Sequence, residues 1–295
     1  RYLDPKRGAL PVNVASIERH TVLGNLNLRP EQSRSWSGGV IYTPAAVPQL
    51  RLSLDYTRIE KTDEISSLTP QQMLDLEDFL PGVIVRNELT PGDAALNYTG
   101  GTIRIFNAGR INIAKSLMEA FDVQVRYQWT TRFGSFSANA RATVQPSLSQ
   151  QAVYEGETVN AVGYSNGPLK WRGNANLGWS NGALEIGWNT QYYHESFVYT
   201  STATQFLKDV ISMGQGSRTI PRQIYHDLNV RYRFDNATGL LGSLFADSDL
   251  LLSVQNVFDA HPPILAAPAP YVVTGYATEG DPRLRRYSIS FTRSF

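Results

Sequence analysis

The sequence has no cysteine, and this absence excludes several kinds of site at once. Disulfide frameworks, thiolate metal sites and cysteine nucleophiles cannot form within its 295 residues. Histidine is scarce too, and the four histidines lie far apart without the spacing of metal ligands. Charged residues are only 18% of the chain and the net charge is +1, which favours no nucleic-acid partner. We therefore expect no metal, no cofactor and no nucleic acid.

Long apolar runs are also missing. No segment approaches the roughly 18 consecutive apolar residues of a transmembrane helix. A membrane β-strand remains compatible with this absence, because its apolar and polar residues alternate. The first residues do not read as a signal peptide, and there is no initiator methionine, so we expect a processed or truncated chain.

What the sequence does contain is a repeated alternation of apolar and polar residues. The clearest case spans residues 169–193, where two alternating runs meet at Asn181-Gly182 and predict a hairpin. The same period predicts about nine antiparallel strands. They cover residues 33–44, 50–65, 111–131, 133–146, 168–180, 183–198, 223–234, 248–257 and 284–295.

The connections between these predicted strands alternate between short and long. They are short near 45–49, 131–133 and 181–182, of middle length at 235–247, and long at 66–110, 147–167, 199–222 and 258–283. Long strands with short turns at one end and long loops at the other are typical of outer-membrane barrels. A soluble β-sandwich has shorter strands, and its loops do not sort by end. We predict an all-β fold, an antiparallel transmembrane β-barrel.

Four stretches resemble the TonB-dependent outer-membrane receptors, in the order and spacing of that family. Residues 24–31 (Gly-Asn-Leu-Asn-Leu-Arg-Pro-Glu) are similar to its loop before a strand, with Leu26 in place of a proline. Residues 52–59 are similar to its long strand entering a surface loop. Residues 253–259, followed by Pro262-Pro263, resemble its penultimate strand and turn, and residues 281–295 resemble its last strand.

The resemblance implies a 22-stranded barrel with a plugged lumen, of which this chain supplies about nine C-terminal strands. Residues 1–32 would form an extracellular loop segment, residues 33–295 strands and loops, and the plug domain is absent from this chain. An open sheet would leave two unpaired edges in lipid. We therefore expect another polypeptide, or the missing N-terminal part, to complete the barrel. Two routes are open: a receptor cut in a surface loop before Arg1 with both pieces paired, or a fragment.

The resemblance also implies a location, a function and partners. It implies the bacterial outer membrane, with the long loops extracellular and the C-terminus periplasmic, and active uptake of a scarce chelate, saccharide or small organic compound. The implied partners are the N-terminal barrel-plus-plug polypeptide, the TonB complex through the plug, the outer-membrane assembly machinery, and lipid or lipopolysaccharide. A surface lipoprotein or a homodimer is left open. The alternatives are a secreted β-rich carbohydrate-binding module and a passive outer-membrane pore.

Strand parity and loop length predict the site residues. Lumen-facing residues at the long-loop end should meet a solute first, which gives the substrate-binding candidates Gln191, Tyr193, Glu195, Tyr199, Arg222, Gln223 and Tyr225. Further lumen-facing candidates are Asp55, Asp122, Arg126, Arg172, Asn176, Asp227 and Arg231. The alternating last strand resembles the signal that the family's assembly machinery reads, carried by Tyr287, Ile289, Phe291 and Phe295.

Three further features of the sequence have simpler interpretations than a chemical role. Residues 163–167 match Gly-x-Ser-x-Gly, but a strand is predicted after them where a nucleophile elbow needs a helix, so we expect no catalysis and no enzyme. A helix is predicted from Thr69, its N-cap, to Pro81-Gly82. On it, Glu77 and Asp78 form either a solvated face or a site for calcium or a cationic ligand.

Overall fold

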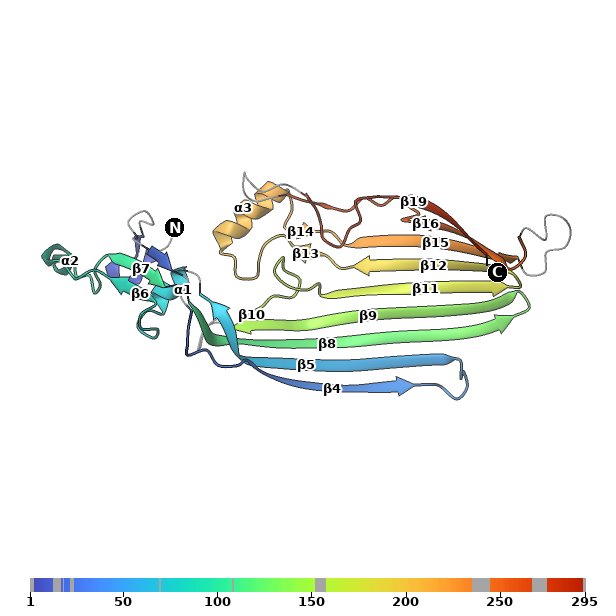
Figure 1. Ribbon diagram of the computed structural model, residues 1–295, viewed down its shortest axis with the longest axis horizontal. Coiled ribbons are helices and arrows are strands. Elements are labelled where there is room, and N and C mark those ends of the chain that lie inside the picture. The colour runs from blue at the N-terminus through green and yellow to red at the C-terminus, as the bar shows by residue number, and fades with distance from the viewer. Residues whose placement is uncertain are drawn as a thin grey trace. The chain divides into compact units, whose positions relative to one another are not determined.

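The computed structural model shows a long antiparallel sheet (Figure 1). It describes residues 3–12, 17, 19–21, 24–68, 70–107, 109–151, 158–234, 245–266 and 275–293. The main strands are β4 (Gln32–Tyr42), β5 (Leu50–Ser67), β8 (Arg110–Thr131), β9 (Gly134–Gln151), β11 (Trp171–Asn181), β12 (Leu184–Tyr193), β15 (Gln223–Phe234), β16 (Ser248–Gln255) and β19 (Arg286–Arg293). These strands confirm all nine that the alternation predicts.

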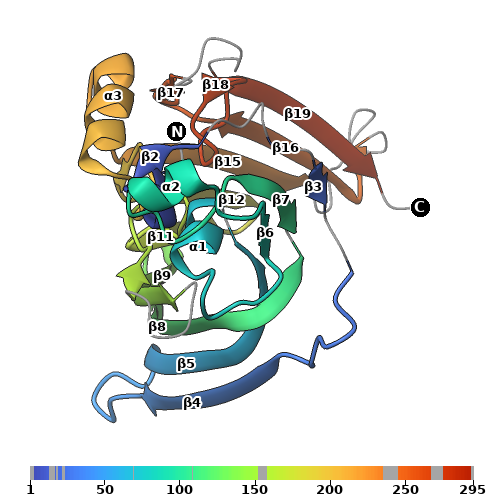
Figure 2. The same cartoon turned by 90° about the vertical axis from the view of Figure 1, so that its left-hand side faces the viewer.

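Each main strand lies beside its neighbours in sequence. The order across the sheet is β4-β5-β8-β9-β11-β12-β15-β16-β19, and the short β10 (Val159–Asn160) pairs with β9. Seen along the strands, the surface from β9 to β19 is curved (Figure 2). Among the described residues, β4 and β19 are the edges and have a strand on one side only. The sheet is therefore an open piece of barrel wall, as predicted.

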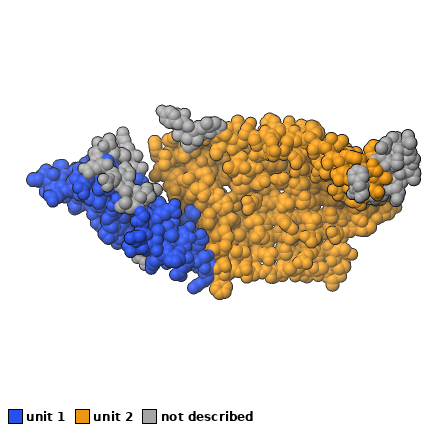
Figure 3. Space-filling view, in the orientation of Figure 1, with its two compact units in different colours: residues 1–34, 60–116, 150–158 blue, residues 35–59, 117–149, 159–295 orange. Residues whose placement is uncertain are grey.

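The chain divides into two compact units (Figure 3). Unit 1 comprises residues 1–34, 60–116 and 150–158, and unit 2 comprises residues 35–59, 117–149 and 159–295. The prediction that residues 1–32 form an extracellular loop segment stays a prediction.

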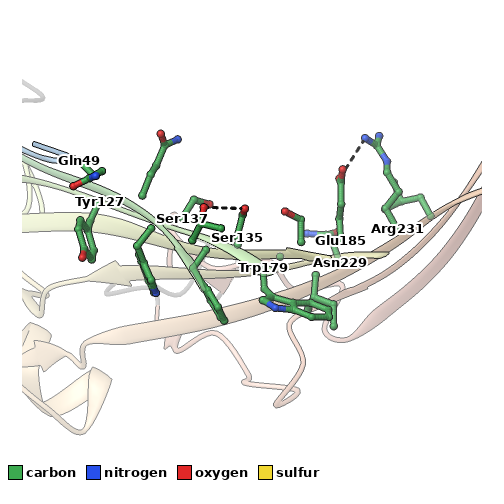
Figure 4. Close-up of a pocket in the computed structure, with 17 residues that line it drawn as sticks. Gln49, Tyr127, Ser135, Ser137, Trp179, Glu185, Asn229 and Arg231 are labelled. Atoms are coloured by element: carbon green, nitrogen blue, oxygen red, sulfur yellow. Dashed lines mark hydrogen bonds and ion pairs between the residues drawn. The ribbon is translucent and has the colours of Figure 1, made fainter. Parts of the chain in front are cut away.

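Strand register sorts the side chains of unit 2 onto two faces. One row across the sheet joins apolar residues, and the next row along the strands joins mostly polar residues on the opposite face. The apolar row is Phe136, Trp179, Ile186, Val230, Leu252 and Ile289, and the polar row is Ser135, Ser180, Glu185, Arg231, Leu251 and Ser290. In Figure 4, Glu185 and Arg231 lie on one side of the sheet and Trp179 on the other.

Aromatic rings gather at both ends of the apolar face. Near the short turns, the Trp129 ring stacks on Tyr127 and on Phe136, with centroids 4.8 and 5.1 Å apart. Near the long connections, Trp171 stacks on Tyr192 at 3.9 Å. Trp171 and Trp179 are eight residues apart on β11, or about 27 Å along the strand. If the strands are tilted by roughly 40° from the barrel axis, this distance corresponds to about 20 Å along that axis, which is comparable to the height of the apolar band of a membrane barrel.

The β11–β12 hairpin is displaced by one residue from the sequence prediction. Asn181 pairs with Leu184, so the two turn residues are Gly182 and Ala183 rather than Asn181 and Gly182. Gly182 has a φ of +57°. A glycine with positive φ at the first turn position suits the type II′ turn, whose twist matches that of the strands. Asn181 thus ends the strand instead of forming the turn.

Unit 1 contains the first 34 residues of the chain and the connection between β5 and β8. Its elements are β1 (Leu3–Asp4), the 3₁₀ turn η1 (Pro5–Arg7), β2 (Leu10–Pro11), β3 (Arg19–Thr21), α1 (Pro70–Asp75), β6 (Ile84–Arg86), α2 (Pro91–Ala95) and β7 (Ile103–Asn107). Strand β7 pairs in parallel with β3 and antiparallel with β6. The buried cluster of this unit is Leu68, Met73, Leu74, Ile84, Ile103 and Phe106.

The helix predicted in this connection is present but shorter than expected. It ends at Asp75, and turns cover the residues up to Pro81-Gly82. The predicted N-cap, Thr69, lies outside the described residues. Glu77 binds Arg86 at 2.8 Å and Asp78 binds Lys6 at 2.6 Å. These two carboxylates are therefore engaged by cations of the chain itself, which leaves no support for a calcium site there.

The other long connections carry short elements of unit 2. These are β13 (Ser196–Phe197), α3 (Gln205–Gln215), β14 (Thr219–Ile220), β17 (Ile264–Leu265) and β18 (Gly275–Tyr276). A second apolar cluster, Val198, Tyr199, Ile220 and Ala277, packs among them. Over the described ranges, no helix has the length and apolar character needed to cross a bilayer.

Candidate functional site

Four of the predicted substrate-facing residues lie together at the long-connection end of the polar face. Strand pairing sets Tyr193 opposite Gln223 and Gln191 opposite Tyr225. The two tyrosine rings meet edge to face, with centroids 6.4 Å apart. The Tyr193 hydroxyl donates to Gln191 Oε1 at 3.2 Å, and the Tyr225 hydroxyl donates to Gln223 Oε1 at 2.6 Å. We call these four residues the Tyr–Gln patch.

The connection between β16 and β19 covers one side of this patch. A Cβ atom on Gly280 would lie 3.0 Å from both Gln223 Oε1 and Tyr225 Oη and would collide with Pro262, so only glycine permits this approach. Gln223 and Tyr225 are consequently buried, at 6% and 7% exposure. Gln191 and Tyr193 stay half-buried and line a hollow on the polar face.

Hydrogen bonds inside this connection hold it in place. The Asn256 side chain bridges to Ala260 through both its amide nitrogen and its oxygen, each at 2.9 Å. Asp281 accepts from Arg283 and from Arg286, each at 2.9 Å. The hydrogen bonds from Arg283 hold the pKa of the Asp281 carboxyl at about 2, so this anion persists at physiological pH. The wall of the patch is therefore fixed by its own polar contacts.

A ladder of polar side chains continues from the patch along the same face. Asn176 donates to Asn189 at 2.8 Å, and Asn189 donates to Asp227 at 3.0 Å. Asp227 also accepts from the Gln191 amide at 3.4 Å and from the Asn256 backbone at 2.9 Å. The ladder therefore connects the patch to the middle of the sheet.

The other predicted lumen-facing residues share this face. Arg172 pairs with Tyr193 across the strands, Asp122 accepts from Thr143 at 2.6 Å, and Arg126 donates to Asn139 at 3.1 Å. Arg231 faces Glu185 at 3.9 Å. A hollow of about 770 Å³ on this face is lined by Asp55, Asp122, Arg172, Gln191 and Tyr193 among others. That this face borders the barrel lumen remains a prediction.

Three of the predicted substrate-binding residues lie away from the patch. Tyr199 is 6% exposed and packs with Val198, Ile220 and Ala277 in the loop cluster. Glu195 follows the end of β12, and Arg222 precedes the start of β15, both as exposed loop residues. Of these three residues, only Glu195 was within a predicted strand, and it lies beyond the end of β12, where strand parity no longer applies. Tyr199 and Arg222 lie outside the predicted strands 183–198 and 223–234.

Sequence reasoning missed two groups of residues at this site. Arg141 and Asn174 also line the hollow, and the alternation in residues 133–146 and 168–180 could have indicated them. Gly280, Pro262 and Asn256, which build the wall of the patch, have no periodic signal. They approach the patch only because a long connection folds back onto β15.

Three residues of the last strand lie on the apolar face. Tyr287, Ile289 and Phe291 pair opposite Val254, Leu252 and Leu250. Phe295 lies outside the described residues. Their predicted role as an assembly signal stays a prediction.

The segment Gly163–Gly167 does not have the geometry of a nucleophile elbow. It is a turn that leads into strand β11, where the elbow needs a helix. Within the described ranges, no group of three or more histidine, aspartate or glutamate side chains is arranged to hold a metal ion.

An antiparallel wall with a polar face, and with an apolar face bordered by aromatic rings at both ends, defines a membrane β-barrel protein. The family model "TonB dependent receptor-like, beta-barrel" matches residues 13–257. The chain belongs to this family, whose members lie in the bacterial outer membrane.

Solved structures show the same fold. A variant of the ferric enterobactin receptor PfeA of Pseudomonas aeruginosa is 15% identical, with a TM-score of 0.55, covering 91% of this chain and 32% of that chain. The siderophore receptor PirA of Acinetobacter baumannii is 17% identical, with a TM-score of 0.55, covering 93% of this chain and 33% of that chain. This chain thus spans about a third of their length. No curated protein sequence matches it.

Proposed function

We propose that this chain forms the C-terminal wall and the solute-facing loops of a TonB-dependent transporter. The Tyr–Gln patch at the long-connection end carries this proposal. It combines two aromatic rings and two carboxamides within one strand pair, and the neighbouring Asp227 carboxylate of the polar ladder accepts from the Gln191 amide. The solute is a scarce chelate, saccharide or small organic compound, since rings and amides can stack on and hydrogen-bond to all three.

The orientation follows from the same proposal. The patch and the long connections face the outside of the cell, and the short turns and the C-terminus face the periplasm, as in other barrels of the outer membrane. A solute would meet Tyr193 and Gln191 first, because these two side chains line the hollow on the polar face. The polar ladder below them would then lead towards the middle of the barrel.

The rest of the transporter comes from outside this chain. The remaining strands and the plug belong to an N-terminal polypeptide, either continuous with this chain or separate and paired with it, and TonB acts through the plug. Intact mass spectrometry of the native detergent-extracted complex distinguishes these two cases. A second polypeptide that copurifies, and whose C-terminus leads directly into Arg1, would establish a split receptor.

Uptake in whole cells tests the transport function. Cells carrying the complete receptor are given radiolabelled members of the three solute classes, with and without a functional TonB. We expect saturable uptake of one class that depends on TonB. Equal uptake in both strains would show a passive pore instead. A receptor portion that stays soluble without detergent would favour the carbohydrate-binding module.

Substitution at the patch tests the site itself. Tyr193→Ala removes a half-buried ring and a hydroxyl, a loss of about 1–2 kcal/mol of binding. We expect the solute concentration for half-maximal uptake to rise roughly 5- to 30-fold, with little change in the maximal rate. Ser253→Ala is the matched control, because it lies on the same face beside Asn229, nearer the short turns. An unchanged half-maximal concentration for Tyr193→Ala would remove the patch from the site.

A further inference from the structure

Helix α3 exposes an apolar stripe. Phe206, Val210 and Met213 recur about every helical turn and so share one side, flanked by Leu207. Their exposed fractions are 73%, 42% and 82%, and that of Leu207 is 45%. A helix of a soluble domain ordinarily buries such a stripe against the core. The stripe therefore indicates a surface that another apolar phase covers.

The opposite side of α3 fixes the helix to unit 2. Ile211 packs on the cluster of Val198, Tyr199, Ile220 and Ala277. The Gln215 side chain donates to the Ile264 carbonyl at 2.8 Å and accepts from the Ala266 amide at 2.7 Å. Thr204 caps the start of the helix, and Gly216, in the left-handed region, ends it. With this side occupied, the stripe points away from the body of the unit.

The place of α3 in the fold determines what can reach the stripe. Seen along the strands from the long-connection end, α3 lies on the outer side of the curved sheet and is viewed largely side-on (Figure 2). It belongs to the connection between β12 and β15, neither of which is an edge strand of the sheet. Strands that complete the barrel must join at β4 or β19, so they are not placed to cover it.

Helix α3 lies at the same end of the strands as one aromatic border of the sheet's apolar face. Trp171 and Tyr192 end the apolar face at the same end of the strands, and His194 follows them, 5.8 Å from Trp171 between ring centroids. The chain passes from these rings through β13 directly into α3. Aromatic rings of this kind mark the level of the lipid headgroups in membrane barrels.

We propose that α3 is an interfacial helix whose stripe inserts at the headgroup–acyl boundary of the outer leaflet. An amphipathic helix lying in the plane of the interface buries its apolar side in this way. Lys208 and Asp209, the charged residues of the helix, cancel each other, so apolar insertion rather than attraction to anionic lipid holds it. The inference rests on the membrane placement of the sheet and not on transport.

Lipid quenching of single labels tests this inference. Because the chain has no cysteine, Met213→Cys can carry an environment-sensitive fluorophore, once any cysteine in the rest of the complete receptor is replaced. The receptor is reconstituted in phosphatidylcholine vesicles containing lipid with a shallow acyl-chain nitroxide. Gln205→Cys, on the polar side of α3, is the matched control, and Leu177→Cys, on the apolar face of β11, reports insertion of the sheet.

We expect quenching at Met213 several-fold stronger than at Gln205, with little change in high salt. If Met213 and Gln205 are quenched equally weakly while Leu177 is quenched, the inference about α3 is overturned. The membrane placement of the sheet is then still supported. No quenching at Leu177 would overturn the membrane placement, and with it the proposed function. Emission at Met213 that responds to receptor density but not to the nitroxide would show a second copy on the stripe, which also overturns the inference.

Discussion

At Arg86, one guanidinium holds together segments of unit 1 that are far apart in sequence. Its side chain is 9% exposed and donates to Asp4 at 2.7 and 2.8 Å, to Glu77 at 2.8 Å and to the Gly101 carbonyl at 2.9 Å. Burial lowers the pKa of Arg86, but its hydrogen bonds to the carboxylates of Asp4 and Glu77 outweigh this effect and raise the pKa above its usual value. The cation is therefore permanent, and both anions depend on it.

Removing this cation tests its structural role. Arg86→Met leaves the nearly buried Asp4 and the partly buried Glu77 without their common partner, and we expect unit 1 to lose about 3–5 kcal/mol of stability. Hydrogen exchange of the backbone amides in residues 84–107 of the complete receptor measures the loss. Arg104→Met, an exposed arginine on β7, is the control and should change exchange by about 0.5 kcal/mol or less. Similar exchange in the two variants would contradict the structural role.

The β11–β12 hairpin depends on the conformation of one turn residue. Gly182→Val places a β-branched side chain at a φ of +57°, which costs about 1–3 kcal/mol. We expect the receptor to unfold at lower urea concentration, measured by the shift between folded and unfolded bands in gel electrophoresis. Ala183→Val changes the neighbouring turn residue, which lacks a positive φ, and should have less effect. A larger effect at Ala183 would mean that the turn is formed differently.

Elements with enough residues to show a period were predictable, and shorter ones were not. The alternation located the nine main strands because each of them covers at least eight residues. Pairs such as β13 with β14 have two residues each and no period to detect. Helix α3 was overlooked within a predicted loop, although Thr204 and the apolar spacing after it were a readable helix signal.

Residues of the candidate site were likewise predictable where they belong to long strands and unpredictable where they belong to loops. Parity placed Gln191, Tyr193, Gln223 and Tyr225 on one face because all four belong to regular strands. It could not anticipate that Tyr199 would turn into an apolar cluster, because that contact depends on the fold of the whole connection. The close approach of Gly280 is likewise a tertiary contact without a local pattern.

The two edge strands of the sheet, β4 and β19, require partner strands from outside the described sheet. Among the described residues, β4 and β19 pair on one side only. Their apolar side chains are open, with Val40 67% and Ile289 71% exposed. In lipid, each unpaired backbone group at such an edge costs several kcal/mol. Both edges are therefore expected to pair with further strands.

Expression with and without the rest of the barrel tests this requirement. We expect this chain, secreted alone, to give no folded, heat-modifiable species in the outer membrane, and to give one when the N-terminal strands and plug are supplied. In the completed receptor, cysteines at Val40 and Ile289 should each form a disulfide with a cysteine on the adjoining new strand. A cysteine at Leu177, which already has neighbours on both sides, should not. A folded barrel from this chain alone would mean that copies join edge to edge, and that the missing strands are unnecessary.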